Sequence, residues 1–436
     1  MRIIEWQSLT PAQRQAALQR PALREAEDVQ NAASRIIASV RAGGDAALRE
    51  LALRFDGVRI ESIAVEAAEF AAAERALSGV QHAAIDTAIG TVRRFHAAQA
   101  QPSIALQTLP GVKCERLCVP IGAVGLYVPA GSAPLPSTAI MLAVPAAIAG
   151  CPIRVMCTPA RANGAADPAV LVAARKAGVD NVYKIGGAQA VAAMAYGTAT
   201  VPKCDKIFGP GNAWVTAAKQ RVAADPAGAA ADLPAGVTEV LIVADAAARP
   251  DFVAADLLAQ AEHSADAQAL LVTDSSSLAD AVVGEVERQR KSLSRAAILA
   301  ESIGHMRVIL VASLTEALEV ANRYAPEHLL LEVRDARSWL PMVRNAGAVF
   351  LGAWSPESVG DYCAGPNHTL PTYGYARSYS GLGLEDFQKR ISVQELSPAG
   401  LLALGETTLT LAALEGLDAH AAAVSIRLAA LERSAS

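Results

Sequence analysis

The middle of the chain, from about residue 115 to residue 356, repeats one pattern. A short apolar run is followed by a turn rich in glycine or proline and then by a stretch with helical spacing, as in CDKIFGPGN followed by AWVTAAKQRV. Apolar residues at nearly every strand position indicate sheets that are covered on both faces. Strands that alternate with helices favour parallel sheets. The predicted fold class is therefore α/β, with two Rossmann-like doubly wound domains that contain parallel sheets.

The two ends of the chain have a different pattern. Residues 10–56 and 65–100 carry apolar residues at helical spacing, with alanine at many other positions. Thr10 and Pro11 mark a helix start, because threonine can cap a helix and proline suits its first turn. The chain beyond Gly381 shows no strong strand pattern. Helical N- and C-terminal appendages are therefore expected.

Glycine and proline punctuation predicts the domain boundaries. These residues cluster at 125–136 and again at 226–236, and a new apolar strand begins at Val240. A chain of 436 residues is also long enough for two or three domains. The expected parts are an N-terminal helical segment (1–22), a discontinuous first α/β domain (23–126 and 240–381), an inserted second α/β domain (127–239) and a C-terminal helical tail (382–436).

Composition restricts the partners and the compartment. The formal net charge of −5 and the absence of long Lys/Arg runs argue against nucleic acid and anionic membranes as partners. The N-terminal residues lack the pattern of a secretory signal, and no apolar run reaches the roughly 18 residues that span a bilayer. The six cysteines form no CxxC pair, so they are expected to be reduced. A cytoplasmic protein is the expectation.

Glycine-rich turns follow several of the predicted strands. FGPGN, at residues 208–212, follows an apolar run and opens a helix, so its backbone N–H groups could face an anion. YKIGGAQA, at residues 183–190, repeats this arrangement, and GLYVPAGSAPLPST adds a third loop that carries Tyr127. None of them matches GxGxxG. The three loops are compatible with a dinucleotide site and also with simple tight turns.

Four separated clusters carry acids, imidazoles or amides. Gln260 and His263 would project one turn apart from the same helical face, as metal ligands or as surface polarity. Asp361 lies in a glycine-punctuated loop, where aspartate is also a common turn former. His420 follows Glu415 by five positions on a predicted helix, which could equally be a solvated face. No single cluster could bind a metal alone, so the fold would have to unite them.

The pair Glu327–His328 follows Pro326 and precedes an apolar strand. The two side chains could form a pair of proton acceptors at the mouth of the strand, or they could lie in an exposed turn. Imidazole titrates near neutrality, which suits a base that takes a proton from an alcohol as hydride leaves. A carboxylate suits the orientation of a water molecule. One pair could therefore serve two successive steps.

Longer segments of the sequence resemble the histidinol dehydrogenase family. The resemblance runs from RPALR, at residues 20–24, to EGLDAHAAAVSIR, at residues 415–427. It includes GGAQAVAAMAYGT, CDKIFGPGN, DLLAQAEH, YAPEHL and the long segment from WSPESVGDYCAGPNH to GLGLEDFQKR. The resemblance implies an NAD-dependent homodimer with one zinc ion per subunit. Such an enzyme oxidises L-histidinol through L-histidinaldehyde to L-histidine, the last step of histidine biosynthesis, with two NAD and one water.

The resemblance also implies roles for individual residues. The implied proton acceptors are Glu327 and His328. The implied zinc ligands are Gln260, His263, Asp361 and His420. The implied NAD contacts, in or beside the inserted domain, are Tyr127, Gln189 and Asn212. The implied substrate contacts are Thr238, Gln260, His263, His328, Asp361, Glu415 and His420. In the family the C-terminal tail reaches the site of the partner subunit, so dimerisation would complete the active site.

One departure from the family pattern lies just before Val240. The segment reads PAGVTEV, so Val237 and Thr238 stand where the family usually has proline and serine. Thr238 keeps the hydroxyl, while its methyl group takes space beside the substrate.

Two other functions are compatible with parts of the pattern. The first is a paralogous zinc- and NAD-dependent dehydrogenase of another hydroxylated compound, such as a diol sulfonate. Such relatives tend to lose the segment TYGYARSYSGLGL, which is present here at residues 372–384. The second is a nucleotide-binding protein without catalysis, in which the acids and histidines merely cap turns.

Overall fold

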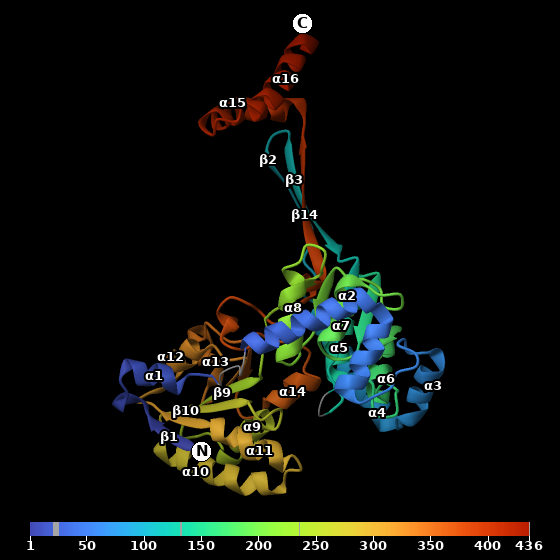
Figure 1. The fold of residues 1–436 in the computed structure, drawn as a ribbon. Helices are drawn as coiled ribbons and strands as arrows, with labels where there is room; N and C mark the ends of the chain where they lie inside the picture. The colour runs from blue at the N-terminus through green and yellow to red at the C-terminus, as the bar shows by residue number, and fades with distance from the viewer. Residues whose placement is uncertain (21–25, 131–132, 235, 436) are drawn as a thin grey trace. The chain divides into compact units, whose positions relative to one another are not determined.

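The chain divides into a larger and a smaller compact unit. The structure, a computed structural model, describes residues 1–20, 26–130, 133–234 and 236–435. The larger unit comprises Met1–Gln99 and Ile121–Phe387, and the smaller unit comprises Ala100–Pro120 and Gln388–Ser436. Figure 1 follows the chain through both units. The predicted boundary between residues 22 and 23 falls outside the described residues.

One parallel sheet of the larger unit has six strands. Its order is β1-β11-β10-β9-β12-β13, and each neighbouring pair is parallel. From β9 outward this is the 3-2-1-4-5 arrangement of a doubly wound fold, with β1 added at one edge. The strands are β1 (Arg2–Glu5), β9 (Glu239–Ala244), β10 (Gln268–Thr273), β11 (Arg307–Leu310), β12 (His328–Glu332) and β13 (Ala348–Leu351).

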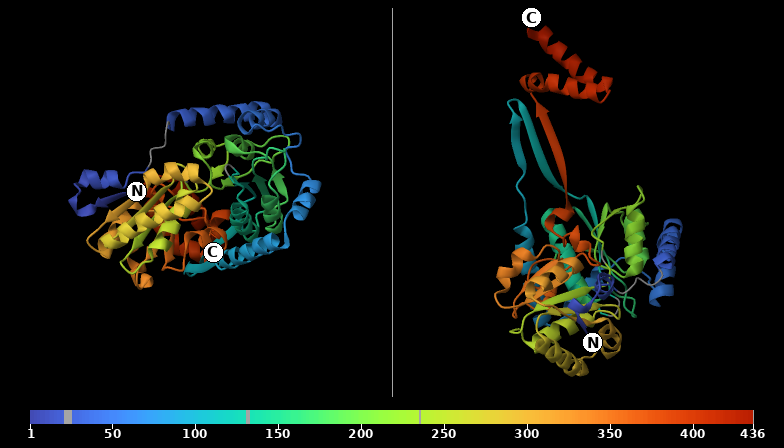
Figure 2. Two further views of the ribbon diagram at one scale, coloured as in Figure 1. Left: turned by 90° about the horizontal axis from the view of Figure 1, so that it is seen from below. Right: turned by 90° about the vertical axis from the view of Figure 1, so that its left-hand side faces the viewer.

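Alternate residues of these strands enter two separate cores. Leu241 and Val243 of β9 face the core that α1, α12 and α13 cover, whereas Val240 and Ile242 face the core beneath α9, α10 and α11. The helices on both faces are visible in Figure 1 and Figure 2. Their bounds are α1 (Pro11–Ala17), α9 (Pro250–Ala261), α10 (Ser276–Gln289), α11 (Ala296–Ser302), α12 (Leu314–Tyr324) and α13 (Ala336–Trp339), with α14 (Glu357–Tyr362) following β13.

The other parallel sheet of the larger unit has five strands. Its order, β6-β5-β4-β7-β8, repeats the 3-2-1-4-5 arrangement. Helices α3 to α6 cover one face and helices α2, α7 and α8 cover the other. The strands are β4 (Ala123–Tyr127), β5 (Ile153–Cys157), β6 (Asn181–Tyr183), β7 (Lys206–Phe208) and β8 (Ala230–Ala231). The helices are α2 (Ala26–Asp56), α3 (Ala67–Ala76), α4 (Gly79–Ala97), α5 (Pro136–Ala149), α6 (Pro168–Lys176), α7 (Gly187–Tyr196) and α8 (Ala213–Ala223). Two doubly wound parallel sheets confirm the predicted fold class.

The predicted starts of two helices are confirmed. Thr10 caps α1 and forms a capping box with Gln13, and Pro11 occupies the first helical position as expected. Asn212 caps α8 by accepting a hydrogen bond from the Val215 N–H. Both helices therefore begin where the sequence predicted, α1 after Thr10 and α8 after the FGPGN turn.

The grouping of the N-terminal helices differs from the expected one. Residues 23–126 were expected to form one domain with residues 240–381, but α2, α3 and α4 pack on the five-stranded sheet, whose β4 also begins before residue 127. Residues 1–22 were expected to form a helical segment, but residues 2–5 form β1, which adds a parallel strand to the six-stranded sheet. Helical spacing identifies an apolar face of a helix and does not specify which sheet that face covers.

The smaller unit combines an antiparallel sheet with two helices. Its strand order is β14-β3-β2, and Figure 2 shows this ribbon leading into α15 and α16. The tail from residue 382 was expected to be helical, whereas β14 is a strand that pairs with β3 along its nine residues. Most of β14 is exposed, so it lacks the apolar alternation that would have revealed it. The elements are β2 (Ile104–Leu109), β3 (Val112–Pro120), β14 (Gln388–Leu396), α15 (Pro398–Leu414) and α16 (Asp418–Ala435). None of the described helices has both the length and the apolarity needed to cross a membrane.

Candidate active site

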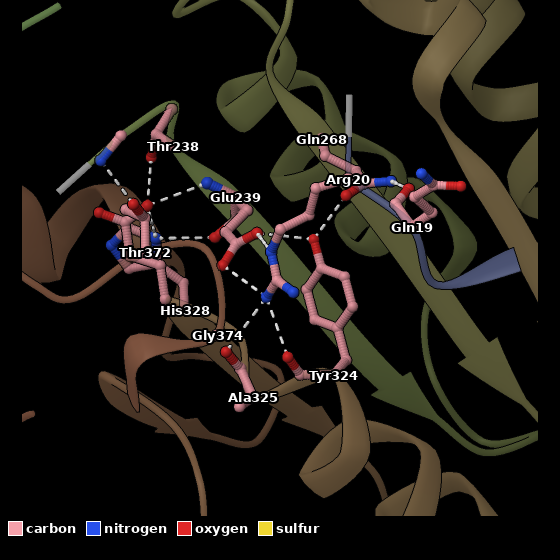
Figure 3. A network of polar contacts seen from close by, with 12 residues as sticks. Gln19, Arg20, Thr238, Glu239, Gln268, Tyr324, Ala325, His328, Thr372 and Gly374 are labelled. Carbon is pink, nitrogen blue, oxygen red and sulfur yellow. Dashed lines mark hydrogen bonds and ion pairs between the residues drawn. The ribbon is translucent and has the colours of Figure 1, made fainter. Parts of the chain in front are cut away.

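The candidate active site lies where strands β9 and β12 begin. The two strands are neighbours, with His328 opposite Val240, so the Glu327–His328 pair lies beside Thr238 and Glu239. Figure 3 shows Thr238, Glu239 and His328 as parts of one polar network. The loop from β13 through α14 and the end of α9 add further polar groups. The sequence-predicted clusters at 260–263, 327–328 and 361 therefore meet in one place.

Glu327 is a buried carboxyl group held on one oxygen. Its Oε2 accepts a hydrogen bond of 2.6 Å from the Thr238 hydroxyl and one of 2.9 Å from the Glu239 N–H. Burial raises the pKa of Glu327 to about 7, while His328 and the two hydrogen bonds oppose that rise. A carboxyl group that titrates near neutrality can take up and release a proton under ordinary conditions.

His328 is buried with its two ring nitrogens in different surroundings. Nδ1 lies 3.2 Å from the Glu239 carbonyl oxygen, which can accept its proton. With Nδ1–H as the donor, Nε2 is the acceptor of the neutral ring. Nε2 is buried without a hydrogen-bond partner among the described residues, 3.7 Å from Asp361 Oδ1. This nitrogen is therefore free to accept a proton from a ligand.

Carboxylates around His328 determine its charge. Burial alone would lower the pKa of the ring, but Glu357, Glu327 and Asp361 outweigh it and raise that pKa well above its ordinary value. Glu357 Oε1 lies 3.6 Å from Nδ1, and burial raises the pKa of Glu357 to about 8. A cation bound at these carboxylates would offset their charge and bring the imidazole back toward its neutral form.

Three ligand groups lie close enough together to hold one metal ion. Candidate ligand atoms of His263, Glu357 and Asp361 all lie within 4.8 Å of one another. Glu357 and Asp361 are four residues apart on α14, so they share one face of that helix, and His263 follows α9. Glu357 was not among the sequence-predicted residues. Its four-residue spacing from Asp361 after Pro356 was the signal that could have identified it.

Gln260, three residues before His263, carries a further candidate ligand atom. Its side-chain N–H₂ donates to the Thr238 hydroxyl at 2.8 Å, while its Oε1 is buried without a partner among the described residues. Buried polar atoms are almost always paired, so the unpaired Gln260 Oε1 and the unpaired His328 Nε2 each point to a missing ligand. Imidazole nitrogen and carboxylate oxygen are donors that zinc accepts. The residues present therefore fit a divalent cation.

The charges near His263 and Asp361 also favour metal binding. Burial of the ring lowers the pKa of His263, although the residue as a whole keeps an exposed part, and the shift favours the neutral ring. Burial would raise the pKa of Asp361, but His328 and the other two nearby histidines lower it overall. A neutral imidazole and an ionised carboxylate are the protonation states that coordinate a metal.

Thr238 connects Gln260, a candidate metal ligand, to Glu327, a candidate proton acceptor. Its hydroxyl accepts a hydrogen bond from Gln260 and donates one to Glu327. The serine that the family usually has at this position offers the same hydroxyl. Threonine in place of serine therefore preserves the hydroxyl group. In this structure the hydroxyl links Gln260 to Glu327 through two hydrogen bonds.

The predicted nucleotide contacts lie on the five-stranded sheet. Tyr127 ends β4, its hydroxyl accepts a 2.9 Å hydrogen bond from the Gly187 N–H, and burial raises its pKa to about 12. Gln189 is buried in α7, while Asn212 is exposed at the start of α8. These positions follow β4, β6 and β7 at their carboxyl ends. Strands β4 and β7 flank the point where the strand order reverses, which is where doubly wound sheets bind ligands.

The FGPGN turn has a rigid, glycine-dependent backbone. Gly209 has a φ of 125°, and a Cβ there would lie 2.2 Å from the Tyr127 carbonyl oxygen. The Gly209 N–H donates to Asp232 at 2.7 Å, and its carbonyl accepts from Lys219 at 2.9 Å. Lys219 and Asp232 form a buried ion pair beneath the turn. The loop therefore presents a fixed backbone at the start of α8.

Two sequence-predicted residues lie in the other unit. Glu415 follows α15 and His420 lies in α16, and both side chains are exposed. Their assignment as substrate and zinc contacts stays a prediction.

A buried acid near the site gives a prediction for the dependence of stability on pH. Burial raises the pKa of Asp256, in α9, to about 7, and nearby Glu332 raises it further. Between about pH 4 and pH 7 the folded protein keeps this proton while the unfolded chain loses it, so the group destabilises the fold as pH rises. Asp256→Asn is expected to stabilise the protein by roughly 2–4 kcal/mol at pH 7.5 and by little at pH 4.5.

Urea unfolding of wild type and variant at the two pH values measures this difference. Asp280→Asn, at an exposed position of α10, is the matched control and should change stability little at either pH. An equal effect of Asp256→Asn at both pH values would contradict the raised pKa.

Comparisons with known proteins agree with the geometry. A sequence model of the histidinol dehydrogenase family matches residues 18–428. The chain is 55% identical over 428 residues to the histidinol dehydrogenase of Xanthomonas euvesicatoria pv. vesicatoria, spanning 98% of this chain and 99% of that protein. It is 51% identical over 434 residues to the histidinol dehydrogenase of Vibrio cholerae, spanning 100% of each.

A solved structure extends this agreement to the fold. The crystal structure of histidinol dehydrogenase from Elizabethkingia anophelis superposes with a TM-score of 0.95 at 41% sequence identity, covering 99% of both chains. Both the sequence match and the structural match span nearly the whole molecule. The chain therefore belongs to the histidinol dehydrogenase family of oxidoreductases.

Proposed function

We propose that this protein oxidises L-histidinol through L-histidinaldehyde to L-histidine, with NAD and one zinc ion per subunit, as the last step of histidine biosynthesis in the cytoplasm. The observation that carries the proposal is the unpaired, buried His328 Nε2 beside the ligand cluster of His263, Glu357 and Asp361. A proton acceptor and a metal-binding cluster share one site. Family membership supplies the substrate class.

The zinc ligands proposed from this chain are Gln260, His263 and Asp361, with His420 contributed from a C-terminal tail. Bound zinc would supply a Lewis acid and a template for the imidazole and amino nitrogens of the substrate. The Gln260 Oε1 is suited to this task because its amide N–H₂ already has a partner in Thr238. Asp361 and His263 have the required protonation states before any metal binds.

Substitution of a proposed zinc ligand is expected to weaken metal binding. Asp361→Asn removes the negative charge that favours the cation and should lower zinc affinity by about 10–100-fold. Zinc-to-protein ratios measured after dialysis against a graded chelator give the affinity. His328→Asn is the matched control, because the proposal gives His328 no metal bond. Loss of zinc from the control, with retention by Asp361→Asn, would contradict the assignment.

NAD is proposed to bind at the carboxyl ends of β4, β6 and β7, with contacts from Tyr127, Gln189 and Asn212. Bound NAD supplies the hydride acceptor. The support is the position of Tyr127 and Asn212 after β4 and β7, where the strand order reverses, together with the fixed backbone of the FGPGN turn. Asn212 is exposed at the start of α8, where free backbone N–H groups favour a phosphate.

His328 is proposed to act in the first oxidation. Its Nε2 accepts the hydroxyl proton of histidinol as hydride leaves the carbinol carbon, which gives the aldehyde. The Glu239 carbonyl holds the Nδ1 proton, so the free lone pair stays on Nε2. The buried carboxylates around the ring then stabilise the imidazolium that forms.

Glu327 is proposed to act in the second oxidation. Its carboxylate takes a proton from water as the water oxygen bonds to the aldehyde carbon, and the resulting hydrate loses a second hydride to give the carboxylate. A pKa of about 7 places this base near the working pH. Because the site is buried, the reactive aldehyde is shielded from bulk water between the steps.

A homodimer is proposed, in which the tail of each chain contributes Glu415 and His420 to the site of the other. The smaller unit exposes large apolar side chains, including Leu414 at 79% and Ile426 at 67%, of the kind that an interface covers. The proposed substrate contacts are Thr238, Gln260, His263, His328, Asp361, Glu415 and His420.

The stoichiometry of turnover tests the proposed function. Purified protein with zinc and NAD should form two NADH for each L-histidine from L-histidinol. One NADH with release of the aldehyde would contradict the four-electron reaction. Oxidation of another alcohol, with histidinol untouched, would instead identify a paralogous dehydrogenase of another hydroxylated compound. NAD binding without turnover of any alcohol would indicate a nucleotide-binding protein without catalysis.

A further inference from the structure

Glu239 touches both proposed proton acceptors through its main chain. Its N–H donates to Glu327 Oε2 at 2.9 Å, and its carbonyl oxygen lies 3.2 Å from His328 Nδ1. A small shift of this one peptide segment would displace both groups and would also alter which nitrogen of His328 carries the proton. The position of Glu239 therefore controls the geometry of two chemical steps.

The Glu239 side chain is fixed by a buried ion pair. Arg20 donates to it through two nitrogens, from Nε to Oε2 at 2.6 Å and from a terminal nitrogen to Oε1 at 2.9 Å. The side chains of Arg20 and Glu239 are only 15% and 2% exposed. The Tyr324 hydroxyl lies 2.7 Å from Glu239 Oε2 and 2.7 Å from Gln268 Oε1. Figure 3 shows Arg20 and Tyr324 converging on this carboxylate.

Arg20 also binds the turn that leads into β12. The terminal nitrogen that contacts Glu239 lies 2.9 Å from the Tyr324 carbonyl oxygen and 3.3 Å from that of Ala325, and the guanidinium lies 3.9 Å from the Tyr324 ring centre. Ala325 has a φ of 55°, an uncommon conformation for a residue with a side chain. Two residues later the chain reaches Glu327. The Arg20 guanidinium thus binds both the first residue of β9 and the turn that precedes Glu327 and His328.

We propose that Arg20 is a positioning residue that holds Glu327 and His328 in register with the main chain of Glu239. The inference rests on the proposed roles of Glu327 and His328. Arg20 lies outside the described sheets, and its guanidinium contacts neither acceptor directly, so it acts through Glu239 and the 324–325 turn. Planar donors that point in fixed directions suit this task, and the single ammonium group of lysine does not reproduce them.

Arg20→Met and Arg20→Lys test the proposal. Both variants should retain zinc, because Arg20 does not touch the ligand cluster, while kcat with histidinol falls by about 10²-fold and KM changes little. Compared with Arg20→Met, Arg20→Lys should regain more of the thermal stability than of kcat, since lysine replaces the positive charge but not the planar arrangement of donors. Steady-state kinetics, zinc-to-protein ratio and melting temperature are measured together. If Arg20→Met fails to fold, Arg20→Lys carries the same comparison.

Arg154→Met is the matched control. The Arg154 guanidinium binds the main-chain carbonyls of Cys151 and Gly178 on the five-stranded sheet, away from Glu239. Its loss should lower the melting temperature and leave kcat within about twofold, because these partly buried contacts stabilise the fold without positioning the acceptors. A fall of kcat in Arg154→Met as large as that in Arg20→Met would overturn the proposal.

A combined variant separates positioning from general stability. In protein that already carries Glu327→Gln and His328→Asn, adding Arg20→Met should lower the residual turnover by less than about twofold, because the groups that Arg20 positions are absent. A further fall of about 10²-fold there would overturn the positioning role. If Glu327→Gln and His328→Asn leave turnover intact, the proposed function fails. If those two variants lose turnover while both Arg20 variants keep wild-type kcat, only this inference fails.

Discussion

His328→Asn is expected to lower kcat for L-histidinol oxidation by about 10²–10⁴-fold while the protein keeps its zinc. Asparagine at this position can still donate to the Glu239 carbonyl in place of Nδ1. It offers no basic nitrogen where Nε2 lies buried and unpaired, 3.7 Å from Asp361. The hydroxyl proton of the substrate then has no acceptor as hydride leaves. NADH formation in steady state, with zinc content measured on the same sample, gives the result.

Histidinaldehyde as substrate provides the internal comparison for this variant. In the proposed mechanism the second oxidation begins with water and Glu327, so His328→Asn should oxidise the aldehyde at a rate much closer to that of wild type. The surrounding carboxylates contribute to the expected loss, because they stabilise the imidazolium that only histidine can form. An unchanged kcat with histidinol would remove His328 from the mechanism. Loss of zinc would show that the residue serves the metal instead.

The fold class followed from the sequence because its determinants are local. Apolar runs bounded by glycine and proline predicted the buried parallel strands, and Thr10 and Asn212 lie at the helix starts that cap chemistry requires. The assignment of α2, α3 and α4 to a sheet was wrong because packing partners depend on long-range contacts. Strand β14 was not predicted, because it is mostly exposed and its partner β3 lies more than 260 residues earlier in the chain.

The candidate site divides in the same way. Glu327, His328, Gln260, His263 and Asp361 stand out in the sequence by their chemistry, and the fold brings them together. Glu357 and Glu239 did not stand out. Their importance depends on burial and on which neighbour their atoms face, and a single sequence does not contain that information. Glu239 acts through its main chain, which any residue would provide, while the requirement for its carboxylate becomes clear only with Arg20 opposite.

Glu327→Gln is expected to have the opposite substrate preference to His328→Asn. Glutamine retains an oxygen that can accept from Thr238 and from the Glu239 N–H, so the local fold should persist. It has no proton-accepting carboxylate, so aldehyde oxidation should fall by about 10²–10³-fold, whereas the alcohol step should fall much less. Single-turnover measurements with each substrate separate the two steps.

The pH dependence adds a test that a structural defect would not reproduce. If the carboxylate form of Glu327 is the base, as proposed, the rate of the aldehyde step in wild type should rise with pH through about 7, where this group loses its proton. The glutamine variant has no proton to lose there, so its residual rate should lack that rise. Equal losses of Glu327→Gln and His328→Asn on both substrates would refute the division of labour. A rise near pH 7 that persists in the glutamine variant would assign the titration to another group. Asp256, with a pKa raised to about 7, is a candidate by value. Glu357, with a pKa raised to about 8, is a candidate by position, because its Oε1 lies 3.6 Å from His328 Nδ1.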